Sequence, residues 1–241
     1  STGPFFCGSV LSAADIAWAP FLERFAAQLP CFYPELLPRD ASTCRWTKLA
    51  QWYDAMDTVP VYACRIKGTC ESWHKVLAAD PWWPKGWAAP QLSKIGADRA
   101  ARTYGAAASA AKWAEYARTR TQVAPSASLE AAATIVRNRQ AILKDSCRRR
   151  MVYGTVPYQQ GTPTETIDEG LRALVWLLIT EINDNHEAIA GLAPSVVAST
   201  RDCAAYMSAR MCVPRDMGMP AALEVHRWHA ALDAWLEKEP S

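Results

Sequence analysis

The chain has 241 residues, half of them hydrophobic, which is enough to bury a sizeable core in one or two domains. Its formal net charge of +2 gives no electrostatic basis for binding nucleic acid or an acidic membrane surface. The most apolar segment, residues 171–179, is about half as long as a membrane-spanning helix, and no secretory signal peptide opens the chain. We therefore expect a soluble or peripheral protein with no transmembrane segment that binds no nucleic acid.

The eight cysteines form no C-x-x-C pair, so neither a zinc site nor a thioredoxin-type redox motif is indicated. A chain of this length with helical cores does not need disulfides, and reduced, mostly buried thiols are the favoured interpretation. Such thiols fit the cytosol or an organelle stroma. The cysteines are Cys7, Cys31, Cys44, Cys64, Cys70, Cys147, Cys203 and Cys212.

The first predicted helix has the clearest start signal in the chain. Ser12 is a good N-cap residue, and Asp15 stands three positions later, where its carboxylate can accept from the amide of Ser12. Leu11 and Ile16 occupy the two positions of a hydrophobic staple. The apolar residues that follow predict a helix that runs on towards Leu29. We interpret Ser12 and Asp15 as structural capping residues, not as catalytic groups.

The same stretch carries a family resemblance. Residues 3–25 read G-P-F-F-x-G-x-x-x-S-x-A-D-I-A-x-A-P-F-L-E-R-F, which resembles the helical C-terminal domain of glutathione S-transferases. Residues 49–62, L-A-x-W-Y-D-A-M-D-x-x-P-x-Y, look like a later segment of that domain, in which a helix ends before a proline. The resemblance implies an all-α fold in which the capped helix is central and buried.

The resemblance also sets an expectation about glutathione. A complete transferase holds glutathione in an N-terminal thioredoxin-like domain, which also supplies the Tyr, Ser or Cys that activates the thiol. This sequence begins just before the capping box, so we expect the chain as written to lack the glutathione site. Glutathione would be a cofactor only together with that domain, and we predict no catalytic, cofactor-binding or metal residue in this chain.

Periodicity and turn residues predict further helices along the chain, and alanine-rich tracts with few β-branched runs favour helix throughout. A capping box formed by Thr166 and Glu169 is expected to begin one long, buried helix that ends near Gly191. Ser128 is expected to cap the helix before it. The predicted helices cover residues 43–58, 60–67, 72–79, 98–118, 128–147, 166–191, 199–213 and 220–235.

A segment rich in tryptophan and proline, residues 81–96, is the predicted domain linker. It separates residues 1–80, the latter part of a transferase C-terminal-like helical domain, from residues 97–241, a helical extension packed against it. Three tryptophans within six residues are costly to leave in water. Either these indoles pack onto the protein's own helices, or they form a candidate contact with a partner protein. The three residues are Trp82, Trp83 and Trp87.

A second, less specific resemblance covers the later part of the chain. V-P-R-D-M at residues 213–217 and A-A-x-x-x-x-x-N-R-x-A-I-L-K-D at residues 131–145 are similar to transferase-family proteins of oxygenic phototrophs that carry a helical extension. The resemblance implies a chloroplast location, in the stroma or peripheral to a membrane. The cytoplasm is the alternative.

Other candidate residues carry weaker signals. His226 and His229 lie three apart on the last predicted helix and can face one ligand, but no other metal-binding side chain is placed beside them by the sequence. Cys7 lies near the start of the first helix, where a mixed disulfide is conceivable. The favoured interpretation is a small buried residue in a tight turn between Phe6 and Gly8.

Two functional hypotheses follow. In the first, the chain is a non-catalytic structural or protein-binding subunit of a larger assembly, derived from a glutathione S-transferase. The helix that is central in that family would then expose apolar surface, which the extension or a partner protein must cover. In the second, the chain is a fragment of a glutathione-dependent transferase or reductase whose catalytic domain lies upstream or on a separate chain.

Overall fold

The computed structural model describes residues 2–40, 42, 45–69, 72–73, 76–77, 106–146, 162–180 and 184–238. In these residues the regular structure is helical, apart from one isolated bridge between Phe5 and Gly8, so the all-α prediction is confirmed. The chain divides into two compact units. The first comprises residues 1–116 and 212–219, and the second comprises residues 117–211 and 220–241.

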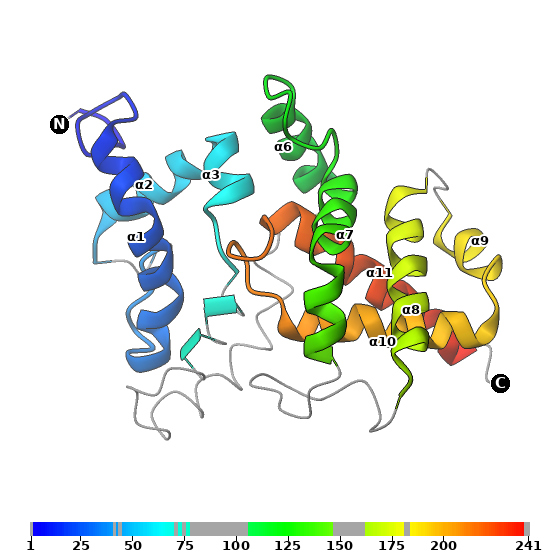
Figure 1. Ribbon diagram of the computed structural model, residues 1–241. Coiled ribbons are helices and arrows are strands. Elements are labelled where there is room, and N and C mark those ends of the chain that lie inside the picture. Colours follow the sequence, from blue (N-terminus) through cyan, green and yellow to red (C-terminus); the bar gives the residue numbers. More distant parts are fainter. Residues whose placement is uncertain are drawn as a thin grey trace. The chain divides into compact units, whose positions relative to one another are not determined.

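The first unit is built on α1 (Ala13–Phe32), α2 (Thr47–Asp57), α3 (Pro60–Arg65) and α6 (Ala106–Ala117). Helix α1 lies near α2 and α3 (Figure 1) and is tied to them by side-chain hydrogen bonds. Pro60 occupies the first turn of α3, where its missing amide hydrogen costs no helical bond. The predicted linker, residues 81–96, lies outside the described residues, and the first unit continues beyond it to α6.

Aromatic side chains form the core of this unit. The ring of Trp52 meets those of Tyr53 and Tyr62 edge to face, with centroids 5.1 and 6.2 Å apart. The segment 212–219 packs closely against the end of α3, because a Cβ on Gly218 would lie 2.0 Å from the carbonyl oxygen of Cys64. Only glycine fits there without a shift of the backbone.

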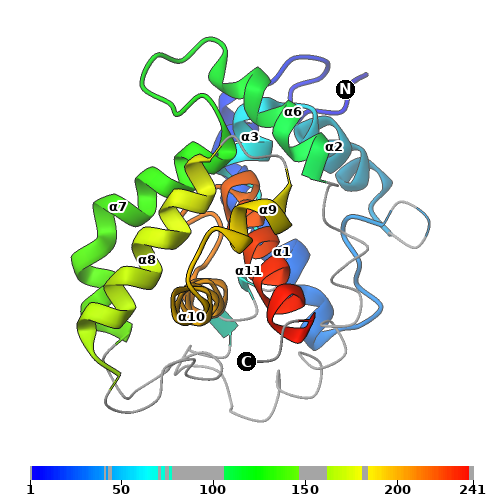
Figure 2. The same cartoon turned by 90° about the vertical axis from the view of Figure 1, so that its right-hand side faces the viewer.

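The second unit contains α7 (Ala127–Ser146), α8 (Thr164–Ile179), α9 (Asn185–Ala190), α10 (Pro194–Arg210) and α11 (Met219–Lys238). Helices α7 and α8 run side by side (Figure 2), and α10 crosses α8 steeply (Figure 1). Large side chains of α8 and α11 fill the interior. Fully buried among them are Ile167, Leu171, Leu174, Leu177, Trp228 and Leu232.

The long helix predicted for residues 166–191 is two helices. Helix α8 begins after Pro163, so Thr166 lies inside it and does not cap it. It ends at Ile179, and the backbone of the next residue, Thr180, is extended. The side chain of Asp184 then accepts a hydrogen bond from the amide of His186 and caps α9. Asp and Asn compete with the helix for backbone groups, which favours a restart over a continuous helix at this point.

The residue that caps α7 also differs from the predicted one. The Ser126 hydroxyl accepts from the amide of Leu129 at 3.2 Å. Ser128, predicted to be the cap, instead donates to Glu224 of α11 at 3.0 Å. Both serines stand at the same helix start, and a neighbouring acceptor from α11 decides which one caps. In the described residues, no helix is long and apolar enough to cross a bilayer.

Candidate functional site

The chain enters α1 through a tight turn. The backbone groups of Phe5 and Gly8 pair in both directions, at 3.0 and 3.1 Å, and Gly8 takes a φ of 115° that side-chain-bearing residues rarely adopt. This turn aims the amide of Phe6 at the start of the helix. Cys7 lies in the turn and is exposed, not buried as the sequence suggested.

Asp15 collects the donors around the start of α1. Its carboxylate accepts from the amide and the hydroxyl of Ser12, at 2.8 and 2.6 Å. It also accepts from the amide of Phe6 at 3.0 Å and from the indole Nε1 of Trp52 at 2.8 Å. Burial alone would raise the pKa of Asp15, but these hydrogen bonds outweigh it and lower the pKa to about 2. The carboxylate therefore connects three segments by hydrogen bonds: the N-terminal turn, the start of α1 and helix α2.

A second set of charges, centred on the buried Glu23, lies further along the inner side of α1. The Glu23 carboxylate, 3% exposed, pairs with the guanidinium of Arg39 and accepts from the Tyr62 hydroxyl. Arg39 also reaches Asp57 at 3.3 Å, and Lys67 reaches the same carboxylate at 2.6 Å. Burial and the neighbouring carboxylate of Glu23 raise the pKa of Tyr62.

The charged groups of this network pair with one another. Burial, followed by the nearby charge of Arg39, lowers the pKa of Lys67, while its ammonium remains paired with Asp57. The second oxygen of Glu23 accepts from the amide of Gly68 at 3.2 Å. Buried charges that are paired in this way are costly to separate, and they fix the positions of the elements that carry them. We read this network as structural.

The outer side of α1 has the opposite character. All seven exposed residues of the helix are apolar and none carries a charge. The large ones are Ile16 at 63% exposed, Trp18 at 52%, Phe21 at 57% and Phe25 at 43%. We call these seven residues the outer face; they are Ala13, Ile16, Ala17, Trp18, Pro20, Phe21 and Phe25.

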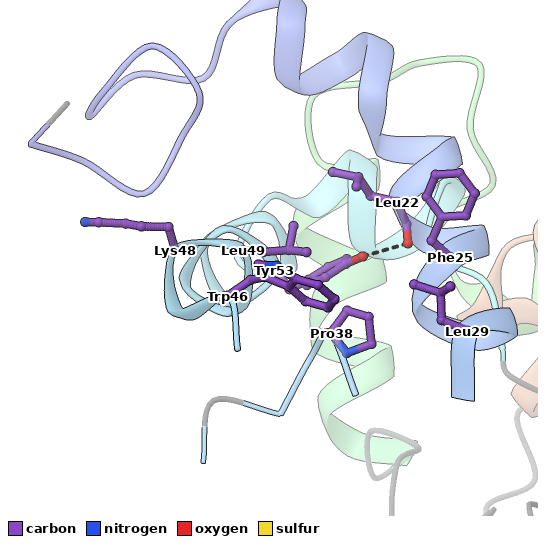
Figure 3. Close-up of a pocket in the computed structure, with 8 residues that line it drawn as sticks. All are labelled: Leu22, Phe25, Leu29, Pro38, Trp46, Lys48, Leu49 and Tyr53. Atoms are coloured by element: carbon purple, nitrogen blue, oxygen red, sulfur yellow. Dashed lines mark hydrogen bonds between the residues drawn. The ribbon is translucent and has the colours of Figure 1, made fainter. Parts of the chain in front are cut away.

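A shallow apolar groove adjoins the outer face at Phe25. It has a volume of about 370 Å³ and lies between α1 and the start of α2 (Figure 3). The Tyr53 hydroxyl donates to the carbonyl of Leu22 at 2.6 Å and closes one side, while the ammonium of Lys48 points away from the groove. The lining residues are Leu22, Phe25, Leu29, Pro38, Trp46, Lys48, Leu49 and Tyr53. The groove extends the apolar surface of the outer face.

The other predicted candidates either belong to the second unit or lie outside the described residues. Trp82, Trp83 and Trp87 lie outside the described residues. His229 pairs with Asp233 one turn along α11, with 3.2 Å between Nε2 and Oδ2. Within the described part of the chain, no group of three or more His, Cys, Asp or Glu side chains is placed to hold a metal ion.

The sequence predicted that this helix would expose apolar surface, but it did not identify the residues that form the outer face. The pattern of α1 indicates an apolar side, and the family resemblance implied that the helix is central and buried. A contrary signal was present: Asp15, predicted to be held by the capping box, and Glu23 stand eight residues apart, on nearly the same side of a helix. That side faces α2 and α3, so the large apolar residues point outward.

Comparison with known proteins finds a similarity in the N-terminal part of the chain. Residues 1–55 match the family model described as "Glutathione S-transferase, C-terminal domain". The matched region ends within α2 and so includes all of α1 and its outer face. No curated protein and no solved structure matches the chain.

Proposed function

We propose that the chain is a non-catalytic, protein-binding subunit, and that residues 1–55, which match the model of a glutathione S-transferase C-terminal domain, belong to its docking element. The observation that carries the proposal is the uncharged outer face of α1. Its partner is a protein that covers this face within a larger assembly.

The energetics of α1 support this proposal. A half-exposed aromatic side chain leaves on the order of 100 Å² of surface in water, and covering it contributes about 2 kcal/mol. Trp18, Phe21 and Phe25 adjoin one another, and the rings of Trp18 and Phe21 lie 6.0 Å apart. Contiguous apolar patches of several hundred Å² on soluble proteins mark interaction sites. A protein that covers these three side chains together therefore gains the most binding free energy from this helix.

The polar groups of the same unit support a structural role. Asp15 already accepts four hydrogen bonds, and Glu23 is shared between a guanidinium, a hydroxyl and an amide. A general acid or base must be free to exchange its proton with a substrate. These carboxylates are occupied by the protein itself.

The proposal is tested by comparing two tryptophan variants of the tagged chain in cells of its source. Trp18→Ser removes an aromatic side chain from the outer face, and Trp176→Ser removes a similarly exposed one, 40% exposed, from α8. We expect Trp18→Ser to release the chain from a larger native particle, as measured by size-exclusion chromatography with mass detection. Trp176→Ser should leave the particle intact. Equal behaviour of the two variants would refute docking through α1.

The alternative function is that of a fragment of a glutathione-dependent transferase or reductase. The family match itself favours this candidate, since complete members of the resembled family are enzymes with a separate thioredoxin-like domain. Retention on immobilised glutathione separates the two candidates. The native protein from source cells is applied, because the chain alone would lack the glutathione site under either candidate; under our proposal it passes through the column and shows no glutathione turnover. Specific retention with elution by free glutathione would support the enzyme instead.

We also propose a chloroplast location, in the stroma or peripheral to a membrane. The support is the resemblance of residues 131–145 and 213–217 to transferase-family proteins of oxygenic phototrophs. Fractionation of source cells with an antibody against the chain tests it. Recovery with plastids fits the proposal, and recovery with the cytosol would contradict it.

A further inference from the structure

The connection between α10 and α11 belongs to a different unit from the helices that it joins. Helix α10 and, from Pro220 onwards, helix α11 are parts of the second unit, but residues 212–219 between them are part of the first. We call residues 212–219 the strap. The chain therefore passes between the two units three times, after Tyr116, after Met211 and after Met219. Two domains that simply follow one another in sequence are joined by a single passage.

The strap is packed into the first unit through its backbone. The amide of Val213 donates to the buried hydroxyl of Ser72 at 2.8 Å. Near the other end, a Cβ on Gly218 would lie 2.0 Å from the carbonyl oxygen of Cys64 and 3.6 Å from the ring of Trp113. Both Cys64 and Trp113 are fully buried. The strap therefore fills a place in the core of the first unit, and its removal would open that core beside Trp113.

The strap also stabilises its own shape. The amide of Cys212 donates to the carboxylate of Asp216 at 2.8 Å, and the amide of Asp216 donates to the carbonyl of Cys212 at 2.9 Å. Arg215 and Asp216 are exposed, so the turn has one side in water and one side in the core. Because this turn is formed by bonds within the strap, little further conformational entropy is lost when the strap packs. Its buried side chains are Cys212, Val213, Met217 and Met219.

We propose that the strap makes the folding of the first unit depend on the second. Residues 1–116 lack the segment that completes their core, and the second unit supplies it on a turn whose two ends continue into long helices. A segment held at both ends binds as if it were present at a high local concentration, so it packs stably although few residues take part. When α10 and α11 unfold, the strap is no longer held in place and the first unit opens.

The test cuts the chain between the two units and measures what still holds the two pieces together. A site for a sequence-specific protease is inserted after Arg120, within residues 118–122, all of which are exposed. The folded full chain is then cleaved, which leaves no covalent bond between the piece that carries α1 to α6 and the piece that carries the strap. We expect the two pieces to sediment as one particle. Pieces that separate at all concentrations would overturn the inference.

Two variants of the cleaved protein assign this association to the strap. Gly218→Ala forces a methyl group against the carbonyl of Cys64 and should raise the dissociation constant of the two pieces by about tenfold or more. Ser72→Ala removes the acceptor of the Val213 amide and should raise it by about threefold or more. Gly191→Ala is the control, because its added Cβ meets only an ordinary van der Waals contact, and it should leave the dissociation constant unchanged.

Circular dichroism before cleavage shows whether each variant is folded. If the Gly218→Ala chain does not fold, the milder Ser72→Ala variant decides the question. Dissociation constants equal to that of the parent in the folded strap variants would overturn the inference, because contacts other than those of the strap would then hold the two pieces together. A rise in the strap variants that Gly191→Ala does not share would support it.

Discussion

Asp15 is a buried carboxylate whose stability derives from its hydrogen bonds. It is fully buried, yet four donors from three segments point at it. Two of these donors belong to Ser12, so the capping box predicted from the sequence is present as part of a larger arrangement. The donors from Phe6 and Trp52 tie the N-terminal turn and α2 to the start of α1. A single side chain thereby sets how the first helix meets its neighbours.

Replacing this carboxylate should destabilise the first unit. In Asp15→Asn, one acceptor oxygen becomes an NH₂ group that faces the donors of Ser12 or of Phe6 and Trp52. We expect the free energy of unfolding to fall by about 2–3 kcal/mol, the usual cost of breaking a buried, charge-assisted network. Urea denaturation followed by circular dichroism measures this change. Asp54→Asn, at an exposed position of α2, is the matched control, and an equal loss there would contradict the account.

The lowered pKa of Asp15 predicts a pH dependence of stability. The pKa falls from 3.8 to about 2 on folding, because the hydrogen bonds favour the ionised form over the effect of burial. The resulting contribution, about 2 kcal/mol, is fully present above pH 4 and is lost as the pH falls towards 2. Comparison of the parent with Asp15→Asn between pH 6 and pH 2 isolates it. The stability difference should shrink in acid, and a difference independent of pH would refute the assignment.

At the scale of elements, α8 and α10 approach each other through small residues. A Cβ on Gly170 of α8 would lie 2.6 Å from the carbonyl oxygen of Ser199 of α10. The Ser199 hydroxyl donates to the carbonyl of Thr166 at 2.6 Å, and the Cys203 thiol contacts the carbonyl of Ile167 at 3.3 Å. Without the glycine, the two helices are held too far apart for these side-chain contacts.

Gly170→Ala should therefore weaken the second unit although alanine is the better helix former. We expect a loss of about 1–3 kcal/mol, the typical cost of forcing an extra methyl group into a closely packed contact. Chemical denaturation measures this loss. Gly191→Ala is the control, because a Cβ there would lie 3.7 Å from the carbonyl oxygen of Ala188, an ordinary van der Waals distance. A gain of stability in Gly170→Ala would mean that the helices separate freely.

At the scale of the whole molecule, local patterns predicted the helices well. The all-α class, the start of α1 and the proline at the start of α3 follow from residue types and spacing alone. The break between α8 and α9 was missed, because the apolar periodicity suggested one continuous helix, whereas Asp184 caps a new one. The cap of α7 was misplaced by two residues, since the choice depends on Glu224, which is distant in sequence.

The candidate site was harder to predict for the same physical reason. Periodicity tells which residues of α1 share a side, but the neighbouring elements decide which side is covered. The buried network around Glu23 depends on Arg39, Asp57 and Tyr62, whose convergence is a property of the fold. Because these charged groups occupy the inner side of α1, its large aromatic residues lie on the outer side.

The central claim is that the outer face of α1 is covered in the native protein. Hydroxyl-radical footprinting of the chain within its native extract measures this directly, with Trp18 as the probe and Trp176 as the internal reference. In the unbound chain Trp18 is 52% exposed and Trp176 is 40% exposed, so free chains should show the faster oxidation at Trp18. Our account predicts the reverse order in the native extract, with Trp18 strongly protected. Oxidation of Trp18 at the rate of the free chain would show that the face is open to water and would contradict the account.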